Sequence, residues 1–431
     1  MVWSGAMSAP DTHRVAAAIW RIESPKLIAM LVRLVRSVDL AEEIAQEAFV
    51  EALHGWRTSG VPDKPGAWLM TAAKRGALDA LRHSRRAERK HEEVARELSP
   101  TAPPTFDESL DDIVGDDLLR LLFVACHPVL SPEARVALTL RLLGGLTTDE
   151  IATAFLVPEP TVAQRITRAK RTLAEKAIPF ELPRPEDLTE RLDSVLEVIY
   201  LVFNEGYLAT AGDDWMRPSL CDDALRLGRV LAELLPQHAE VHGLLALMQI
   251  QASRSGARTR PNGEAVLLLA QDRSKWDPRL IQAGLIALAR GEALAGRYPG
   301  PYLLQAAIAA CHARATRTED TDWALITAYY ETLARVAPSP IVELNRAVAA
   351  SMALGPEAAL AIVDPLLDDP AMANYPFLPS VRADCLAKLG RHAEAQREVE
   401  RAAALTKNAQ ERSLLLQRAA AYARAQTATR D

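Results

Sequence analysis

The chain has 431 residues, 49% of them hydrophobic, and a formal net charge of −6. Its length predicts two or three domains, and the lack of a long apolar run excludes a membrane-spanning helix. The net charge argues against a uniformly basic nucleic-acid-binding protein, so such a role would need local basic patches. Aromatic residues are few, and alternating β-type runs are lacking. The composition therefore predicts an all-α fold.

The N-terminal segment and the first helical unit come first in the chain. Residues 1–12 lack the pattern of a secretion signal and are predicted to be a disordered tail. Residues 13–90 are predicted to form a helical unit that contains DLAEEIAQEAFVEAL. In this helix Asp39 is the expected N-cap, and Glu42 stands at capping-box spacing. One face is acidic, which is typical of a solvated surface or of a docking surface for a basic partner. It consists of Asp39, Glu42, Glu43, Gln46 and Glu47.

A basic helix follows a loop rich in Gly and Pro near residues 60–66. Its basic side chains would bind phosphates with strong salt dependence. Trp56 and Trp68 flank the loop, and each either packs in the core or stacks on a nucleic-acid base, with the core favoured for Trp68. The basic ridge consists of Lys74, Arg75, Arg82, Arg85 and Arg86, with Asp79 among them.

A second helical unit is predicted over residues 110–178, after a Pro-rich acidic linker at 91–109. It contains TTDEIATAFLVPEPTVAQRITRAKRTL. Val157 and Pro158 end one helix of this segment, and a second begins near Pro160. Two short helices joined by a tight turn, the second with a basic outer face, are typical of a helix-turn-helix that reads the DNA major groove.

The outer face of the second helix carries side chains suited to bases and phosphates. Arginine can pair bidentately with guanine, and glutamine with adenine. Leu156 occupies the turn position where glycine is usual, which predicts a different path for the turn. Candidate base contacts are Thr161, Gln164, Arg165 and Arg168, and candidate phosphate contacts are Lys170 and Arg171.

Residues 188–431 are predicted to be helical. Near residues 341–405, small residues recur at a fixed spacing with a Leu-Gly pair at the turn, which is typical of tetratricopeptide-like repeats. Two polar and aromatic segments, 204–207 and 272–276, either line a ligand or peptide site or serve as caps and interhelix contacts, and the second alternative is favoured. The recurring residues are Ala347 and Ala359, then Ala383 and Ala395.

The chain carries no pattern typical of an enzyme or a metalloprotein. Its four cysteines are scattered without zinc-binding spacing, so they are expected to be buried free thiols. Nucleophile motifs and Gly-rich phosphate loops are lacking, so we expect no catalytic residue, no cofactor and no metal site.

The acidic helix, the segment PGAWLMTAAKRGALDALRHSRR, the linker and the helix-turn-helix resemble, in this order, regions 2 and 4 of an extracytoplasmic-function (group 4) sigma-70 family RNA polymerase sigma factor. The resemblance covers roughly the first two-fifths of the chain. The remainder, with segments such as DSVLEVIYLVFNEGY, resembles the C-terminal extension of a subfamily with tetratricopeptide-like repeats (ECF42-like).

The resemblance implies an alternative sigma factor in the cytoplasm that directs core RNA polymerase to specific promoters. The acidic face would dock on the β′ coiled coil, and the polymerase β flap would be a second contact. The helix-turn-helix candidates would read the −35 promoter element. The C-terminal domain would modulate activity, with a protein or a small ligand as its partner. The residues implied for the −10 element are Trp56, Trp68, Lys74, Arg75, Asp79, Arg82, Arg85 and Arg86.

Two other classes of protein stay open. One is a helix-turn-helix transcription regulator with a ligand- or protein-sensing helical tail. The other is a helical-repeat scaffold or enzyme whose basic helices are incidental. The sigma factor is favoured because a simple regulator needs neither an acidic docking helix nor a basic helix after it.

Overall fold

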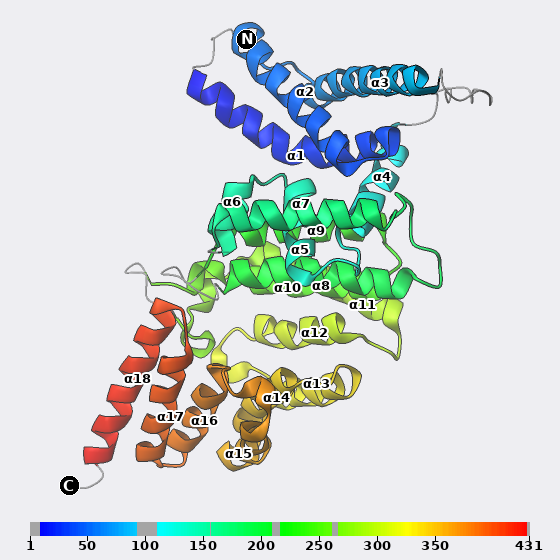
Figure 1. Cartoon of the computed structure of the whole chain (residues 1–431). Helices are drawn as coiled ribbons and strands as arrows, with labels where there is room; N and C mark the ends of the chain where they lie inside the picture. The colour runs from blue at the N-terminus through cyan, green and yellow to red at the C-terminus, as the bar shows by residue number, and fades with distance from the viewer. Residues whose placement is uncertain (1–8, 93–109, 156, 209–215, 261–265, 429–431) are drawn as a thin grey trace, which may run out of the picture. The chain divides into compact units, whose positions relative to one another are not determined.

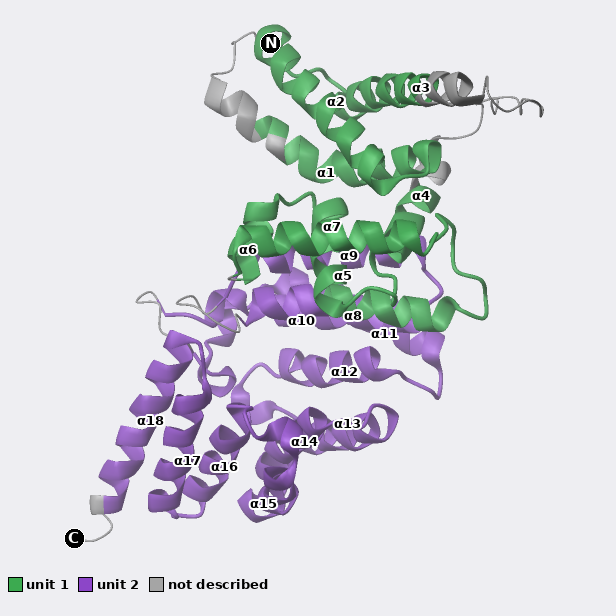
Figure 2. Cartoon of the chain, viewed as in Figure 1, with its two compact units in different colours: residues 1–199 green, residues 200–431 purple. Residues whose placement is uncertain are grey.

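The computed structural model describes residues 9–92, 110–155, 157–208, 216–260 and 266–428. The elements in these ranges are α-helices and short 3-10 helices, which confirms the predicted all-α fold (Figure 1). They form two compact units, residues 1–199 and 200–431 (Figure 2).

Unit 1 contains seven described α-helices and the start of an eighth. The first begins at Ala9, inside the predicted tail of residues 1–12, and residues 1–8 lie outside the described ranges, as does most of the predicted linker. The helices are α1 (Ala9–Val35), α2 (Val38–Ser59), α3 (Pro65–Glu92), α4 (Leu110–Ala125), α5 (Pro132–Leu142), α6 (Thr148–Phe155), α7 (Glu159–Glu175) and α8 (Leu188–Tyr207).

Helices α1, α2 and α3 pack around a core of apolar side chains. Leu27, Ile28 and Leu31 follow the helical spacing of α1 and are at most 2% exposed. Leu69 of α3 and Ile44 of α2 are also buried. Burying such a side chain stabilises the fold by about 1.5–3 kcal/mol, so this face fixes α2 beside α1.

The start of α2 differs from the prediction. Ser37, and not Asp39, is the N-cap, because its hydroxyl accepts a hydrogen bond from the backbone N–H of Leu40 at 3.3 Å. Asp39 lies in the first helical turn, where its charge complements the helix dipole. Glu42 therefore does not form the predicted capping box with Asp39, and its carboxylate binds side chains of other helices.

A buried carboxylate connects α1 to α4. Asp117 is 1% exposed, and its two oxygens lie 2.9 Å from Nε of Arg33 and 2.9 Å from an Nη of Arg120. Burial raises the pKa of Asp117, and the two guanidinium groups oppose that rise. Removing either arginine would leave buried charge without full compensation.

The beginning of α8 packs on α4 and α5 within unit 1. Arg191 donates to the carbonyl of Phe123 at 2.6 Å, and the Ser194 hydroxyl donates to the carbonyl of Cys126 at 2.5 Å. Arg135 of α5 contacts Ser194 and forms an ion pair with Glu197 at 3.0 Å. The last of the helices in unit 1 is thus joined to the preceding ones by buried polar contacts.

Unit 2 is also helical over its described residues. Its α-helices are the end of α8, then α9 (Pro218–Leu234), α10 (Ala239–Ala252), α11 (Pro278–Ala295), α12 (Pro301–Arg314), α13 (Trp323–Val336), α14 (Pro340–Ala353), α15 (Pro356–Val363), α16 (Phe377–Lys388), α17 (His392–Leu405) and α18 (Ala409–Ala428). The 3-10 helices are η1 (Ser255–Ala257), η2 (Leu268–Ala270), η3 (Arg273–Lys275), η4 (Thr318–Asp320), η5 (Asp364–Asp368) and η6 (Pro370–Met372).

Glycines allow α10, α11 and α12 to approach closely. A Cβ atom at Gly243 of α10 would lie 2.7 Å from the backbone N of Leu303 in α12. A Cβ at Gly284 of α11 would lie 2.5 Å from Ile250 of α10, and one at Gly291 would lie 2.6 Å from Leu303. Real Cβ atoms avoid such distances, so a side chain at Gly243 would collide with backbone, and one at Gly284 or Gly291 would force the neighbouring side chain to shift.

The last helices of unit 2 bury the recurring alanines. Successive helices from α14 to α18 pack on their neighbours (Figure 1), and all four alanines of the predicted repeat are 0% exposed in one shared core. Each Leu-Gly turn uses a glycine of positive φ, +106° at Gly355 and +74° at Gly390. A side chain is strained in these conformations, which explains glycine at both turns.

The four cysteines are free and buried, which confirms that prediction. Burial raises the pKa of Cys126 to about 12, and it raises that of Cys221 to about 12 as well. Thiols with such pKa values carry almost no thiolate at neutral pH and are chemically inert.

Candidate nucleic-acid interface

The helix-turn-helix lies where the sequence predicts it. Helix α6 ends at Phe155, and α7 begins at Glu159. Thr147 and Glu150 cap the start of α6 reciprocally, since each side chain accepts from the other's backbone N–H, at 3.1 and 2.8 Å. Leu156, the unusual turn residue, lies outside the described residues.

One face of α7 is packed and the other is open. The predicted apolar stripe is buried, with at most 7% exposure for Val162, Ile166, Ala169 and Leu173. Gln164 and Arg168 are exposed, and Thr161 and Arg165 are half-buried. These four candidate base contacts therefore lie in the half of α7 nearest the turn. Packing of the apolar stripe fixes the orientation of this helix.

The two candidate phosphate contacts on α7 differ from each other. Arg171 is exposed and lies 3.4 Å from Glu175. Lys170 is enclosed, because its Nζ atom lies 2.8 Å from Asp39 and 2.7 Å from Glu42 of α2. Burial lowers the pKa of Lys170, but the bonds to the two carboxylates outweigh burial and raise it. The contact of Lys170 with phosphate stays a prediction, and it requires that these ion pairs with α2 first be broken.

Glu42 does not lie on the exposed part of the predicted acidic face. Its side chain is 7% exposed, and Oε1 accepts from Nε of Arg141 at 2.5 Å while Oε2 meets Lys170. Arg141 also donates to the carbonyl of Leu146 at 3.1 Å. Arg21 of α1 adds a pair with Glu150 at 2.6 Å. Cations and anions of the two predicted regions thus bind each other inside unit 1.

The exposed part of the acidic face lies one turn further along α2. Glu43, Gln46 and Glu47 are exposed, whereas Asp39 is exposed but paired with Lys170. Three residues that the sequence interpretation missed continue the same helical spacing: Val50, Glu51 and His54. Val50 is 50% exposed, so an apolar side chain lies among the acidic ones on this face of α2.

The basic ridge of α3 is partly described. Arg75 is exposed, Lys74 is half-buried, and Arg82 forms an exposed ion pair with Asp79 at 3.1 Å. The side chains of Arg85 and Arg86 lie outside the described ones.

The two tryptophans contact each other near the loop. Their ring centroids lie 5.7 Å apart in an edge-on arrangement. Trp56 is 2% exposed, as expected of the core alternative, and its stacking on a base stays a prediction. Trp68 is half-buried and keeps part of its ring at the surface.

The two polar and aromatic segments of unit 2 lie around one arginine. Arg254 donates from Nε to the hydroxyl of Tyr207 at 3.0 Å, and its guanidinium lies 5.7 Å from the ring centroid of Trp276. Asp272 caps η3, and Glu205 pairs with Arg217. These contacts match the favoured interpretation as caps and interhelix contacts.

The described residues contain no group of three or more His, Cys, Asp or Glu side chains placed to hold a metal ion. None of their helices combines the length and apolar character needed to cross a bilayer.

Three family models match successive parts of the chain. Residues 19–87 match the family model for sigma-70 region 2, residues 120–173 match sigma-70 region 4, and residues 191–292 match a family of unknown function (DUF6596). An uncharacterized protein of Rhizobium meliloti is 45% identical over 388 residues, which are 90% of this chain and 91% of that protein.

Relatives with assigned roles match a smaller part of the chain. The probable ECF RNA polymerase sigma factor SigI of Mycobacterium tuberculosis is 27% identical over 166 residues, 38% of this chain and 57% of SigI. The ECF RNA polymerase sigma factor SigK of Mycobacterium ulcerans is 28% identical over 152 residues, 34% of this chain and 78% of SigK.

Proposed function

We propose that the chain is a sigma factor of the extracytoplasmic-function type, which binds core RNA polymerase in the cytoplasm and directs transcription from specific promoters. Matches to sigma-70 regions 2 and 4 and similarity to named sigma factors support this proposal. It acts as a binding protein without catalytic residues of its own. The observation that carries this proposal is the open face of α7, where Gln164 and Arg168 are exposed beside a buried apolar stripe. This face is suited to the −35 element, and polymerase supplies the rest of the affinity.

Run-off transcription with purified core polymerase tests the proposal. We expect specific transcripts from a pool of genomic promoter fragments only when both protein and core enzyme are present. Binding to duplex DNA without any specific transcript would instead identify a helix-turn-helix regulator with a sensing tail.

Substitution of two arginines of α7 tests whether they contact bases or phosphates. Arg165→Ala and Arg168→Ala should each weaken discrimination at the −35 element by about 1–3 kcal/mol, because a bidentate base contact is lost. Lys176→Ala is the matched control, since Lys176 is an exposed cation beyond the end of α7. An equal loss of affinity for all DNA sequences would make the two arginines phosphate contacts.

The exposed acidic part of α2 is the proposed docking surface for a basic coiled coil of the polymerase β′ subunit, and the β flap is the proposed second contact. Complementary charge accelerates and orients such docking. Glu47→Lys should weaken binding to core polymerase in a fluorescence anisotropy titration, whereas Glu181→Lys, an exposed carboxylate beyond α7, should not. Equal affinities of both variants would contradict this surface.

The basic ridge of α3 is the proposed contact to the −10 region. Arg75 and Lys74 would hold phosphates, and Trp68 has the exposed ring surface that stacking on an unpaired base requires. Trp68→Ala should therefore reduce promoter opening, measured by permanganate footprinting, more than it reduces binding to closed duplex DNA.

The ion pairs of Glu42 suggest that α7 separates from α2 during initiation. A −35 element and a polymerase subunit cannot use Lys170 and Glu42 while these side chains bind each other. The helices after α8 are proposed to modulate this activity as an ECF42-like extension with tetratricopeptide-like repeats. The four buried alanines and two glycine turns of α14–α17 support this assignment.

A truncation that tests whether the C-terminal helices modulate activity must leave the contacts within unit 1 intact. Arg191 and Ser194 bind α4, so a truncation before α8 would disturb the helix-turn-helix itself. Truncation after Tyr207 keeps these contacts and should change promoter output in cells while the isolated unit still binds DNA. Unchanged output would remove support for modulation by the extension.

A further inference from the structure

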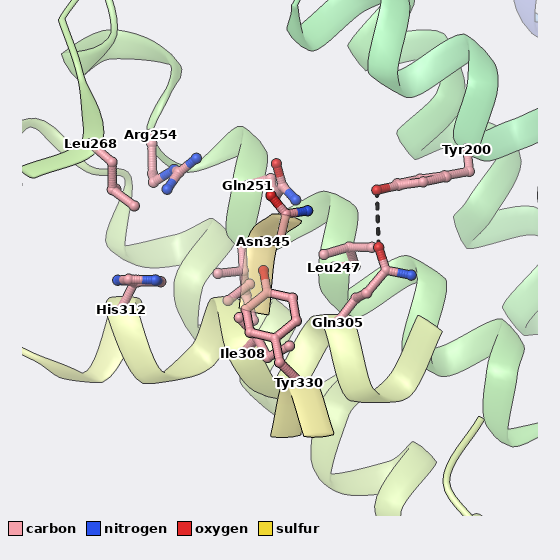
Figure 3. A pocket seen from close by; sticks show the side chains of 12 residues that line it. Tyr200, Leu247, Gln251, Arg254, Leu268, Gln305, Ile308, His312, Tyr330 and Asn345 are labelled. Atoms are coloured by element: carbon pink, nitrogen blue, oxygen red, sulfur yellow. Dashed lines mark hydrogen bonds between the residues drawn. The ribbon is translucent and has the colours of Figure 1, made fainter. Parts of the chain in front are cut away.

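Unit 2 contains a cavity of about 220 Å³ (Figure 3). Side chains from α10, α12, α13 and α14 line it. One wall is apolar and formed by Leu247, Ile250 and Ile308, each at most 6% exposed. Polar groups surround this wall, and Figure 3 shows the hydroxyl of Tyr200 donating to Gln305 at 3.2 Å. The cavity thus combines an apolar surface with hydrogen-bonding groups, as small-molecule sites do.

Among the described residues, the lining of the cavity carries positive charge and no carboxylate. Arg254 lies at its edge, held by the Tyr207 hydroxyl and by the ring of Trp276. These partners orient the guanidinium, and neither of them is an anion. Arg273, whose guanidinium lies 5.0 Å from the same Trp276 ring, donates to the carbonyls of His312 and Ala315.

A histidine of the cavity lining carries a buried polar atom. His312 is 8% exposed and lines the cavity, and its Nδ1 atom has no hydrogen-bond partner among the described residues. An unsatisfied buried polar atom is costly, and most such atoms in folded proteins are paired. Burial lowers the pKa of His312 to about 4, and Arg254 and Arg273 add to this effect. The imidazole is therefore neutral at pH 7 and able to donate one hydrogen bond.

We propose that this cavity binds a small organic carboxylate with an apolar body of about one ring. A cavity of about 150 Å³ accommodates benzene, so a volume of 220 Å³ accommodates a ring with a short acidic group. The carboxylate would lie between Arg254 and His312, and the ring would lie against Ile250 and Ile308. Tyr330 and Gln251 stand at the same cavity for further hydrogen bonds.

The full chain and two isosteric probes test the proposal. Calorimetric titration with benzoate should give saturable binding, and binding of benzamide should be at least tenfold weaker, because the neutral amide lacks the charge that Arg254 recognises. Arg254→Gln should weaken benzoate binding at least tenfold. Arg297→Gln, an exposed arginine outside the cavity lining, is the matched control and should leave binding unchanged.

A second variant covers the case in which Arg254→Gln fails to fold. Ala309→Leu keeps Arg254 and fills part of the cavity, so it should also weaken benzoate binding while the circular dichroism spectrum stays native. Equal binding of benzoate and benzamide, stronger binding of inorganic phosphate than of benzoate, or no saturation by benzoate would each overturn the proposal. The titration needs neither polymerase nor DNA, so its failure would leave the proposed transcription function untouched.

Discussion

The carboxylate of Glu42 should stabilise unit 1 far more than that of Asp39, although both bind Lys170. Glu42 is 7% exposed and meets two cations, Arg141 at 2.5 Å and Lys170 at 2.7 Å. Asp39 is 69% exposed and meets Lys170 alone. The perturbation is the pair of near-isosteric variants Glu42→Gln and Asp39→Asn, each of which removes one negative charge.

The expected magnitudes follow from burial. Removing one partner of a buried ion pair costs about 3–5 kcal/mol. Lys170 keeps Asp39 and Arg141 keeps the Leu146 carbonyl, so we expect about 3 kcal/mol for Glu42→Gln. That loss corresponds to more than a hundredfold change in the unfolding equilibrium constant. An exposed pair contributes about 0–1 kcal/mol, which sets the expectation for Asp39→Asn.

The assay is urea unfolding of the full chain followed by circular dichroism, with the free energy taken from the first transition. A double-mutant cycle of Glu42→Gln with Lys170→Met isolates the coupling between the two side chains, which should reach about 1–3 kcal/mol. Equal losses for Glu42→Gln and Asp39→Asn, or a coupling below about 0.5 kcal/mol, would refute the reasoning that burial makes the Glu42 pairs strong.

Three further outcomes are expected. Ala177→Gly should raise stability by about 0.5–1 kcal/mol in the same unfolding assay, because Ala177, just after α7, has a φ of +49°, which is strained for a residue with a side chain. A loss of stability would show that its methyl group makes compensating contacts. Ellman's reagent should label no thiol of the native protein at pH 8 and four after unfolding, since all four cysteines are buried; rapid native labelling would contradict their burial. Burial, with a smaller effect of Arg191, lowers the pKa of His127 from 6.5 to about 4. Between these pH values the unfolded state binds a proton that the folded state does not, so the stability of the fold decreases as the pH drops from 6.5 to 4. The variant His127→Gln should lose less stability than the parent between pH 7 and pH 5, and equal losses would exclude this histidine as a cause.

The features that followed from local pattern were predictable. Val162, Ile166, Ala169 and Leu173 repeat at helical spacing, and the structure buries all four. The break at Pro158 and the glycine turn at Gly390 follow from backbone sterics, which need no knowledge of distant residues.

The features that depended on distant partners were not predictable. Glu42 was assigned to an open acidic face, but its cation Arg141 lies 99 positions away in the chain. Helical periodicity identifies which residues share a face, and it carries no information on which other helix covers that face. For the same reason, the sequence does not reveal the ion pairs that Lys170 makes with α2.

The close crossing of α10, α11 and α12 limits how this protein can become more heat-resistant. Replacing a helical glycine by alanine ordinarily stabilises a helix by about 1 kcal/mol, and it is a common step in thermal adaptation. At Gly243 the added methyl group would meet the backbone of Leu303, and at Gly284 and Gly291 it would meet packed side chains. At the crossing of these three helices, this route to higher stability is therefore obstructed, and the inner positions keep a residue that is locally a poor helix former.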